Sequence, residues 1–362
     1  MDFQTVDYID WFRVNWKDIK FDLATSGMHA VTQSDLDIQM DDLNFGKTLF
    51  YGDPDLVEQV SEIYGVDKDQ VLITTGSTHA NFMTCALLLK EGDEVIIENP
   101  VYTPLLDLVK AFNCKIKRIE RTFENGYQLD IEKLNEMVSK DTKLIIATNL
   151  HNPSGAMSDH TTFKALSEIA QDRNIHVLSD EVYRDFMMED APPPFSTFTD
   201  LGISTCSLSK FYGSGAIRVG WALCTPEIGD KARKLNDYIT AVNSCAGEGY
   251  GALILKKRTW FVNSVKEITK NNYPIVKDWI ESRDDLEWVE PKYGFIAFPK
   301  INGSFDSMEL TEHLLKKYRT LISPGRFFGP EDHFRLGFGA SEEILKGGLE
   351  NLGLALDELG RG

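Results

Sequence analysis

The sequence predicts an α/β fold in which a mostly parallel sheet is covered by helices on both faces. Short aliphatic and β-branched runs alternate with amphipathic stretches between residues 71 and 208. Three of these runs are followed directly by polar clusters, which is typical of an open sheet that builds a binding site beyond the carboxyl ends of its strands. The alternation indicates repeated βαβ units, because a crossover helix joins neighbouring parallel strands.

The expected strands of this sheet come in chain order with room for a helix between most of them. They are Val71–Thr74, Glu94–Ile97, Lys115–Ile119, Leu144–Thr148, His176–Ser179 and Ser204–Leu208. The clearest amphipathic stretches predict helices at Asp130–Val138 and Phe163–Arg173.

A different pattern follows in the last third of the chain. Residues Lys256 to Ser282 have a long helical periodicity broken only by Pro274, where we expect a kink between domains. Three short strands are then predicted, at Phe295–Phe298, Thr320–Ser323 and Phe334–Gly337. A closing amphipathic helix has leucines on one face, which we expect in the core: Leu345, Leu349, Leu352, Leu356 and Leu359.

Size and composition indicate an ordinary globular protein. The 362 residues are enough for two domains or one large α/β unit. The net charge of -18 disfavours binding to nucleic acid, which depends on clustered lysine and arginine. The five cysteines have no metal-binding spacing, so we expect no metal site, reduced thiols and a cytoplasmic location. No signal peptide or membrane-spanning segment is evident, and we expect no membrane partner.

The most informative segment runs from Ser207 to Gly220, Ser-Leu-Ser-Lys-Phe-Tyr-Gly-Ser-Gly-Ala-Ile-Arg-Val-Gly. It places Lys210 between hydroxyl residues, follows it with a glycine-rich turn and then supplies Arg218. A lysine amine can form a Schiff base with an aldehyde, hydroxyls can hold phosphate oxygens, and a guanidinium can grip a dianion. A surface turn with a solvated lysine is the alternative. The segment therefore predicts a site for an aldehyde cofactor that carries a phosphate.

Two further clusters follow expected strands, Asn152-Pro153-Ser154-Gly155 and Asp180-Glu181-Val182-Tyr183. With the lysine segment, in this order and at these separations, they resemble the pyridoxal-phosphate aminotransferases of class I and II, which have fold type I. The resemblance covers almost the whole chain and includes four further segments: Gly76–Ala80, Pro100–Tyr102, Ser323–Gly329 and Phe334–Gly337.

The resemblance implies an architecture, a cofactor and an assembly. It implies a large cofactor-binding domain at residues 36–267 and a smaller α+β domain formed by residues 1–35 and 268–362, with the site in the cleft between them. The cofactor would be pyridoxal 5'-phosphate, and the working unit would be a homodimer. Amino acids and 2-oxo acids would be the substrates.

Lys210, Asp180 and Tyr183 are the predicted catalytic residues. Lys210 would hold the cofactor aldehyde and, once released, move the proton of the substrate Cα. Asp180 follows an apolar strand, where an unpaired carboxylate is costly, and a pyridinium nitrogen would compensate its charge. A carboxylate that caps a following helix or turn is the alternative. By resemblance, Tyr183 and Asn152 contact the phenolic oxygen of the cofactor, and no role is assigned to Glu181.

The cofactor phosphate is expected at residues that offer hydroxyls, amides and positive charge. Ser77 and Thr78 begin a helical stretch, whose amides and dipole favour an anion, although a plain N-cap is also possible. Arg218 would add charge, and by resemblance Ser207 and Ser209 would add hydroxyls.

Four more positions take their expected roles from the resemblance. Tyr102 would stack on the pyridine ring, with burial as a core aromatic as the alternative. Tyr51 matches, more loosely, a tyrosine that reaches the phosphate of the neighbouring subunit. Arg335 lies in an otherwise apolar strand and would bind the substrate carboxylate, together with Gly27 and Asn152. A buried structural ion pair is the alternative for Arg335.

The sequence thus predicts an enzyme that moves an amino group from an L-amino acid to a 2-oxo acid. The same residues support other outcomes, so a lyase, decarboxylase or cyclase on this scaffold is the second hypothesis. A cofactor-binding module without turnover is the third, and it is disfavoured because the full set of chemical groups is present.

Overall fold

A seven-stranded sheet forms the centre of the computed structural model, which describes residues 1–43 and 49–360. Its strand order is β2-β8-β7-β6-β5-β3-β4. The five strands from β4 to β7 are mutually parallel, whereas β8 is antiparallel to both of its neighbours. The strands are β2 (Val71–Thr74), β3 (Glu94–Asn99), β4 (Lys115–Glu120), β5 (Thr142–Thr148), β6 (His176–Asp180), β7 (Gly202–Ser207) and β8 (Gly220–Leu223). The predicted α/β fold is confirmed, and β8 is the one strand of this sheet that the prediction lacked.

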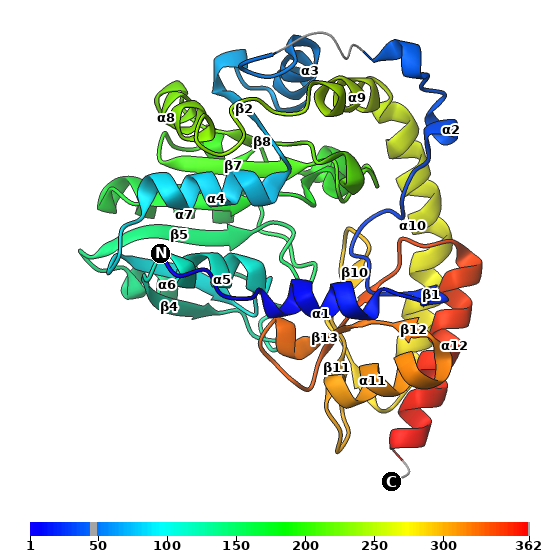
Figure 1. Cartoon of the computed structure of the whole chain (residues 1–362). Coiled ribbons are helices and arrows are strands. Elements are labelled where there is room, and N and C mark those ends of the chain that lie inside the picture. The colour runs from blue at the N-terminus through cyan, green and yellow to red at the C-terminus, as the bar shows by residue number, and fades with distance from the viewer. Residues whose placement is uncertain (44–48, 361–362) are drawn as a thin grey trace.

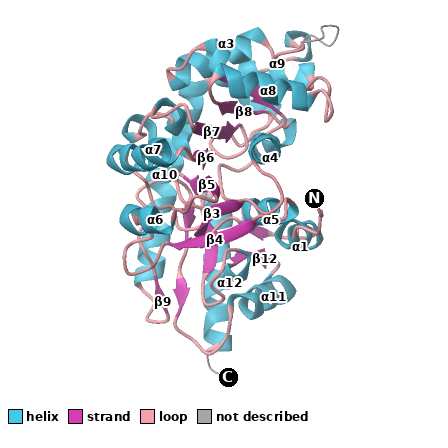
Figure 2. Cartoon of the chain, turned by 90° about the vertical axis from the view of Figure 1, so that its left-hand side faces the viewer, coloured by secondary structure: helices cyan, strands magenta, loops and turns pink. Residues whose placement is uncertain are grey.

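Helices cover both faces of this sheet because the side chains of each strand alternate between two apolar cores (Figure 2). Val95 and Ile97 of β3 face a core that includes α4, α5 and α8, whereas Ile96 faces a core that includes α6 and α7. These helices are α4 (Ser77–Leu88), α5 (Thr103–Ala111), α6 (Ile131–Met137), α7 (His160–Arg173) and α8 (Pro226–Asn236).

Segments from near the two ends of the chain, β1 (Phe21–Asp22) and α12 (Glu342–Leu359), lie side by side (Figure 1). Strand β1 pairs in parallel with β12 (Thr320–Leu321), and α12 packs on β1. Four of the five expected leucines of α12 are buried, and Leu359 packs at the edge of the same core. The expected single strand at residues 320–323 divides into β12 and β13 (Ser323–Pro324), because the chain there passes from pairing with β1 to pairing with β14 (Phe334–Gly337).

The remaining helices and strands belong to this second part, connect to it, or, for α3 (Pro54–Tyr64) and α9 (Cys245–Lys256), pack on each other beside β2. The others are α1 (Asp7–Asn15), α2 (Gln33–Leu36), α10 (Arg258–Glu281), β9 (Leu286–Glu287), β10 (Ile296–Ala297), β11 (Lys300–Ile301) and α11 (Ser307–Tyr318). Helix α10 continues through Pro274 and across the predicted domain boundary at residue 267. That boundary and the one at residue 35 stay predictions, and residues 44–48 and 361–362 of the two predicted domains lie outside the described residues.

The segment from Leu23 to Met28 is clamped between β14 and the lysine loop. The Leu23 carbonyl accepts a hydrogen bond of 2.7 Å from the Gly337 amide, and the Met28 amide donates one of 2.9 Å to the Lys210 carbonyl. A Cβ atom on Gly337 would collide with the Thr25 carbonyl, and one on Gly27 would lie 2.7 Å from the Lys210 carbonyl oxygen. Glycine is required at both positions because backbone approaches backbone there.

Among the described residues, no helix combines the length and the apolar character needed to cross a membrane.

A buried ion pair joins β3 to the residue that follows β4. The side chains of Glu98 and Arg121 are fully buried and form a salt bridge. Glu98 also accepts hydrogen bonds from the Thr148 amide at 2.9 Å and the Thr148 hydroxyl at 3.0 Å, and Arg121 Nε donates to the Tyr127 carbonyl. The pair therefore fixes the end of β5, which precedes Asn152.

Replacing Glu98 by alanine should destabilise the protein strongly. The substitution leaves the Arg121 guanidinium buried without its counter-charge, which costs about 3–5 kcal/mol of unfolding free energy. Chemical denaturation of both proteins measures the difference. As the control, Glu58→Ala removes an exposed pair with Lys68 and should cost less than about 1 kcal/mol. Equal losses in the two variants would contradict the assignment.

Candidate active site

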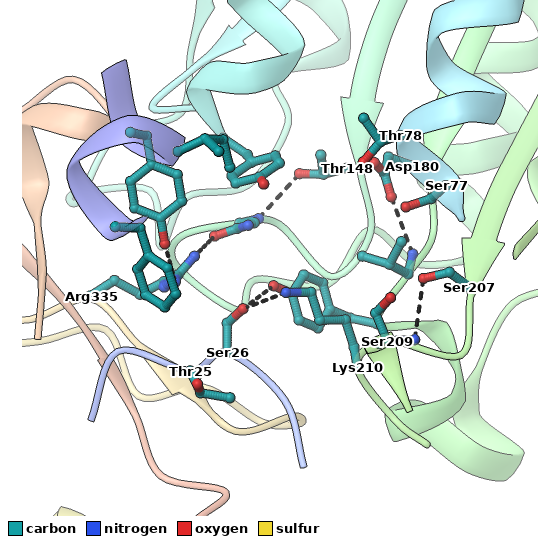
Figure 3. Close-up of a pocket in the computed structure, with 18 of the residues that line it drawn as sticks. Thr25, Ser26, Ser77, Thr78, Thr148, Asp180, Ser207, Ser209, Lys210 and Arg335 are labelled. Atoms are coloured by element: carbon teal, nitrogen blue, oxygen red, sulfur yellow. Dashed lines mark hydrogen bonds between the residues drawn. The ribbon is translucent and has the colours of Figure 1, made fainter. Parts of the chain in front are cut away.

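A cavity of about 350 Å³ lies beyond the carboxyl ends of β5, β6 and β7 (Figure 3). It brings together most of the site residues predicted from the sequence. Those that line it are Ser77, Thr78, Tyr102, Asn152, Asp180, Tyr183, Ser207, Ser209, Lys210, Arg218 and Arg335. They come from six separate stretches of the chain, so the fold alone makes them neighbours.

Lys210 follows β7 and points into this cavity. Its Nζ donates a hydrogen bond of 2.9 Å to Ser26 Oγ and lies 5.8 Å from the centre of the Tyr183 ring. Desolvation by the surrounding protein lowers the pKa of Lys210 to about 8, and the charge of Arg335 acts in the same direction. Near neutral pH, more of this amine is therefore neutral, and hence nucleophilic, than in a solvent-exposed lysine.

Asp180 ends β6 with a buried carboxylate. Its Oδ2 accepts a hydrogen bond of 2.9 Å from Asn81 Nδ2, and its Oδ1 accepts one of 3.3 Å from the Val182 amide. Burial raises the pKa of Asp180. Among the described residues no cation forms a salt bridge with it, so the site would favour a cationic group of a ligand beside this carboxylate.

The N-terminus of α4 forms an anion cradle together with Arg218. Gly76 precedes the helix with a φ of 78°, and a Cβ atom there would lie 2.5 Å from Arg218 Nη2. Among the residues that the structure describes, the guanidinium donates to two carbonyls, Gly215 at 3.0 Å and Thr75 at 3.5 Å. Its positive charge adds to that of the helix end, where Ser77 and Thr78 line the cavity.

Arg335 is buried, with 2% of its surface exposed, and its partners are all neutral. Its Nη1 donates to Asn152 Oδ1 at 2.9 Å. Its Nη2 donates to Tyr8 Oη at 3.0 Å, to the Ala24 carbonyl at 2.9 Å and to Ser323 Oγ at 3.2 Å. No described residue forms the structural ion pair that was the alternative. The guanidinium thus keeps an uncompensated charge at the cavity wall, which suits an anionic ligand.

Two predicted site residues lie outside the cavity lining. Gly27 packs against the backbone of Lys210, and this contact explains the glycine without any ligand. Tyr51 is 71% exposed, and its ring centre lies 5.6 Å from the Arg233 guanidinium carbon. Tyr51 therefore does not reach the cavity of its own chain.

The two other predicted aromatic residues, Tyr102 and Tyr183, both line the cavity. Tyr102 makes an edge contact with Tyr8 at 5.8 Å between ring centres. Tyr183 is buried and donates a hydrogen bond of 2.9 Å to Ser26 Oγ. Glu181, to which no role was assigned, accepts from the Phe195 amide and from Ser204 Oγ, away from the cavity.

Sequence reasoning missed Asn81, which lies beside the cavity, and several residues that line it. Asn81 orients Asp180 and is itself held by a hydrogen bond of 2.7 Å from Thr205 Oγ1. Its position one turn after Ser77, on the same face of α4, was a signal that could have found it. Tyr8, Ser26 and Thr148 line the cavity, and nothing in their local sequence marks them. Among residues 1–43 and 49–360, no group of histidine, cysteine and acidic side chains could hold a metal ion.

Known enzymes are similar to this protein over most of its length. The sequence is 30% identical to an aspartate aminotransferase of Pyrococcus horikoshii over 83% of this chain and 80% of that protein. It is 28% identical to a capreomycidine synthase of Streptomyces vinaceus over 98% of this chain and 94% of that protein.

A solved structure agrees over nearly the full length. A PLP-dependent aminotransferase from Streptococcus suis has a TM-score of 0.92 and 29% identity, with 99% of each chain covered. The model of the family "Aminotransferase class I and II" matches residues 18–352. The matched range includes the cavity residues Lys210, Asp180, Arg218 and Arg335. The protein therefore belongs to the class I and II aminotransferase family.

Proposed function

We propose that the protein is a pyridoxal-phosphate-dependent transaminase that moves an amino group from an L-amino acid to a 2-oxo acid. One observation carries this proposal. A single cavity combines an amine of lowered pKa, a buried carboxylate without a cation, an anion cradle, and a buried guanidinium without an anion. Membership of the aminotransferase family supports the same function.

The residues of the cavity fit pyridoxal 5'-phosphate. The phosphate would lie at the start of α4 beside Arg218, with the hydroxyls of Ser207 and Ser209 on its other side. Asp180 would face the ring nitrogen, and Lys210 would hold the aldehyde carbon. When bound, this cofactor supplies an aldehyde that takes up amines and an electron-withdrawing ring that stabilises negative charge at Cα.

Lys210 is the base best suited to move the Cα proton. Its pKa of about 8 lies closer to neutral pH than that of an exposed lysine, and a general base is most effective when its pKa is close to the pH of the reaction. Tyr183 and Asn152 would donate to the oxygen on the cofactor ring. Asn152 also accepts from Arg335, so one amide joins the cofactor side of the cavity to the substrate side.

Arg335 would bind the substrate carboxylate in a bidentate manner. Neutral hydrogen bonds to Asn152, Tyr8 and the Ala24 carbonyl hold its guanidinium in place without neutralising it. A planar, pre-positioned fork matches a carboxylate and would orient the Cα–H bond towards Lys210.

We also propose a homodimer with shared sites. Three aromatic side chains are strongly exposed: Phe50 at 73% and Tyr51 at 71%, which line one surface pocket, and Tyr238 at 91%. Exposed apolar side chains of this size favour a protein partner. Arg218 is exposed as well, so a phosphate bound there would have room to accept a hydrogen bond from a side chain of a partner subunit.

A cyclase or lyase on the same scaffold is the second candidate. The capreomycidine synthase covers more of the chain than the aspartate aminotransferase does. Lys210 and Arg335 would have the same roles in such a reaction, because the carbanion at Cα can react in several ways. The products decide between the two.

The first prediction is steady turnover with an amino donor and a 2-oxo acid acceptor. The holoenzyme should convert a panel of L-amino acids with 2-oxoglutarate or pyruvate, and chromatography should find the new amino acid and the new oxo acid in equal amounts. Lys210→Ala should abolish both. Release of ammonia or of a cyclic product without a new amino acid would instead favour the second candidate, and the absence of all turnover would favour a non-catalytic module.

The second prediction concerns the charge of Asp180. Asp180→Asn keeps the shape of the side chain and removes the charge that would hold the ring nitrogen protonated. The single-turnover rate with a good donor should fall on the order of 100-fold or more, the scale of one preorganised electrostatic contact. The control is Glu181→Gln, which neutralises the adjacent buried carboxylate outside the cavity and should leave this rate within a few-fold. An unchanged rate in Asp180→Asn would refute the role.

The third prediction concerns the geometry of Arg335. Arg335→Lys keeps the charge but loses the planar fork, so substrate binding should weaken by roughly 1.5–3 kcal/mol while the cofactor stays bound. Isothermal titration with a carboxylate inhibitor measures the loss. Arg258→Lys, at an ion pair with Asp185 outside the cavity lining, is the control for general destabilisation. Normal affinity with lowered thermal stability in Arg335→Lys would favour a purely structural role.

The fourth prediction tests shared sites in a dimer. Tyr51→Ala and Lys210→Ala should each be strongly impaired, the first because a partner's phosphate loses a donor. After subunit exchange, a mixture of the two should regain activity, because hybrid dimers contain one intact site. Sedimentation at the assay concentration gives the assembly state. A fully active monomer would overturn the proposal.

A further inference from the structure

The hydroxyl oxygen of Ser26 accepts hydrogen bonds from two side chains that we propose to be catalytic (Figure 3). Its Oγ accepts a hydrogen bond of 2.9 Å from Lys210 Nζ and one of 2.9 Å from Tyr183 Oη. A serine oxygen has two acceptor lone pairs, so these two donors use both. Among the described residues, Ser26 is the only hydrogen-bond partner of the Lys210 amine.

Backbone contacts on both sides hold Ser26 in this place. On one side, Gly27 packs against Lys210 so closely that a Cβ atom would lie 2.8 Å from the Lys210 Cα, and the Met28 amide donates to the Lys210 carbonyl. On the other side, the Ala24 carbonyl accepts from Arg335 Nη2 at 2.9 Å. Ser26 itself is only 3% exposed. Its position relative to the lysine is therefore fixed by the fold.

We propose that Ser26 is a positioning residue that holds the Lys210 amine at one place in the cavity, beside Tyr183, whenever that amine is not attached to the cofactor. The proposal deepens the function proposed above and rests on it for the role of the lysine. A lysine side chain has several rotatable bonds, and a mobile amine would rarely meet the substrate Cα in a reactive geometry. One fixed acceptor removes most of that freedom.

The contact with Ser26 also affects the charge of the amine. An oxygen that accepts from the ammonium favours the charged form, so Ser26 opposes the desolvation that lowers the pKa of Lys210. The titratable Tyr183 faces this amine, with its ring centre 5.8 Å away. Four further groups act on its charge: Arg335 and Arg218 lower its pKa, and Tyr8 and Asp180 raise it. All four remain when Ser26 is replaced. The contribution of the hydroxyl can therefore be isolated by mutation.

The test measures Lys210 directly in the full chain after the cofactor has been removed. Acetic anhydride labels neutral amines, and mass spectrometry of the Lys210 peptide gives the labelling midpoint as pH is varied. The midpoint should lie near pH 8 in the unmodified protein. In Ser26→Ala it should lie roughly one pH unit lower, the shift expected when one charge-assisted hydrogen bond is lost. Ser26→Thr keeps the hydroxyl and should restore it.

A matched serine separates this role from a purely structural one. Ser204 is 2% exposed and also makes two hydrogen bonds, to Glu181 and from the Ser196 amide, but it does not line the cavity. Ser204→Ala should lower stability and leave the Lys210 midpoint unchanged. Should Ser26→Ala not fold, Ser26→Cys fills a similar space with a weak acceptor and should give the same downward shift.

The holoenzyme supplies the second readout. Ser26→Ala should retain the cofactor, lose roughly tenfold in kcat and keep the donor KM within about twofold, because Arg335 is untouched. An unchanged labelling midpoint in Ser26→Ala, or an equal shift in Ser204→Ala, would overturn the proposal for Ser26 even if the enzyme transaminates. A shifted midpoint in a protein that turns over no donor would support Ser26 and reject the proposed function.

Discussion

The close passage of residues 23–28 between β14 and the lysine loop is the constraint on which the site depends. Glycines at 27 and 337 let backbone meet backbone on the two sides of this segment. The contact brings Ser26 to Lys210 and the Ala24 carbonyl to Arg335, so one short stretch from the start of the chain touches both ends of the cavity. A side chain at either glycine would force these surfaces apart and separate the amine from the guanidinium.

The ionisable side chains of the cavity share one arrangement: neutral groups make hydrogen bonds with them, and no opposite charge forms a salt bridge with them among the described residues. Arg335 and Asp180 are both buried, carry opposite charges, and find amide, hydroxyl or carbonyl partners in place of each other. Such partners satisfy the hydrogen-bonding groups but leave the charges themselves available. The lowered pKa of Lys210 is part of this balance, because it results from desolvation and from the charge of Arg335. By contrast, Glu98 and Arg121 compensate each other fully and serve stability.

The ends of the strands were the most predictable part of the site. Asn152, Asp180 and Lys210 each follow an apolar run, and parallel strands bring such residues to one edge of a sheet. Strand β8 was missed because Gly220–Leu223 is short, begins with glycine and returns antiparallel without a crossover helix. Asn81 was missed because a single asparagine in a mostly apolar helix has no assignable role in the sequence. Its role is evident only when the fold brings it to Asp180.

The sequence by itself determined the α/β architecture, the residues that end the central strands, and the chemical groups available for a phosphate-bearing aldehyde cofactor. These properties are encoded locally, in hydrophobic periodicity and in the order of short motifs. Only the tertiary structure decided that Tyr8 and Ser26 belong to the site, that Gly27 packs on Lys210, and that Tyr51 lies outside the cavity of its own chain. The physical reason is that these contacts join residues up to 327 positions apart, and their geometry follows from how the segment near the N-terminus packs between β14 and the loop that carries Lys210.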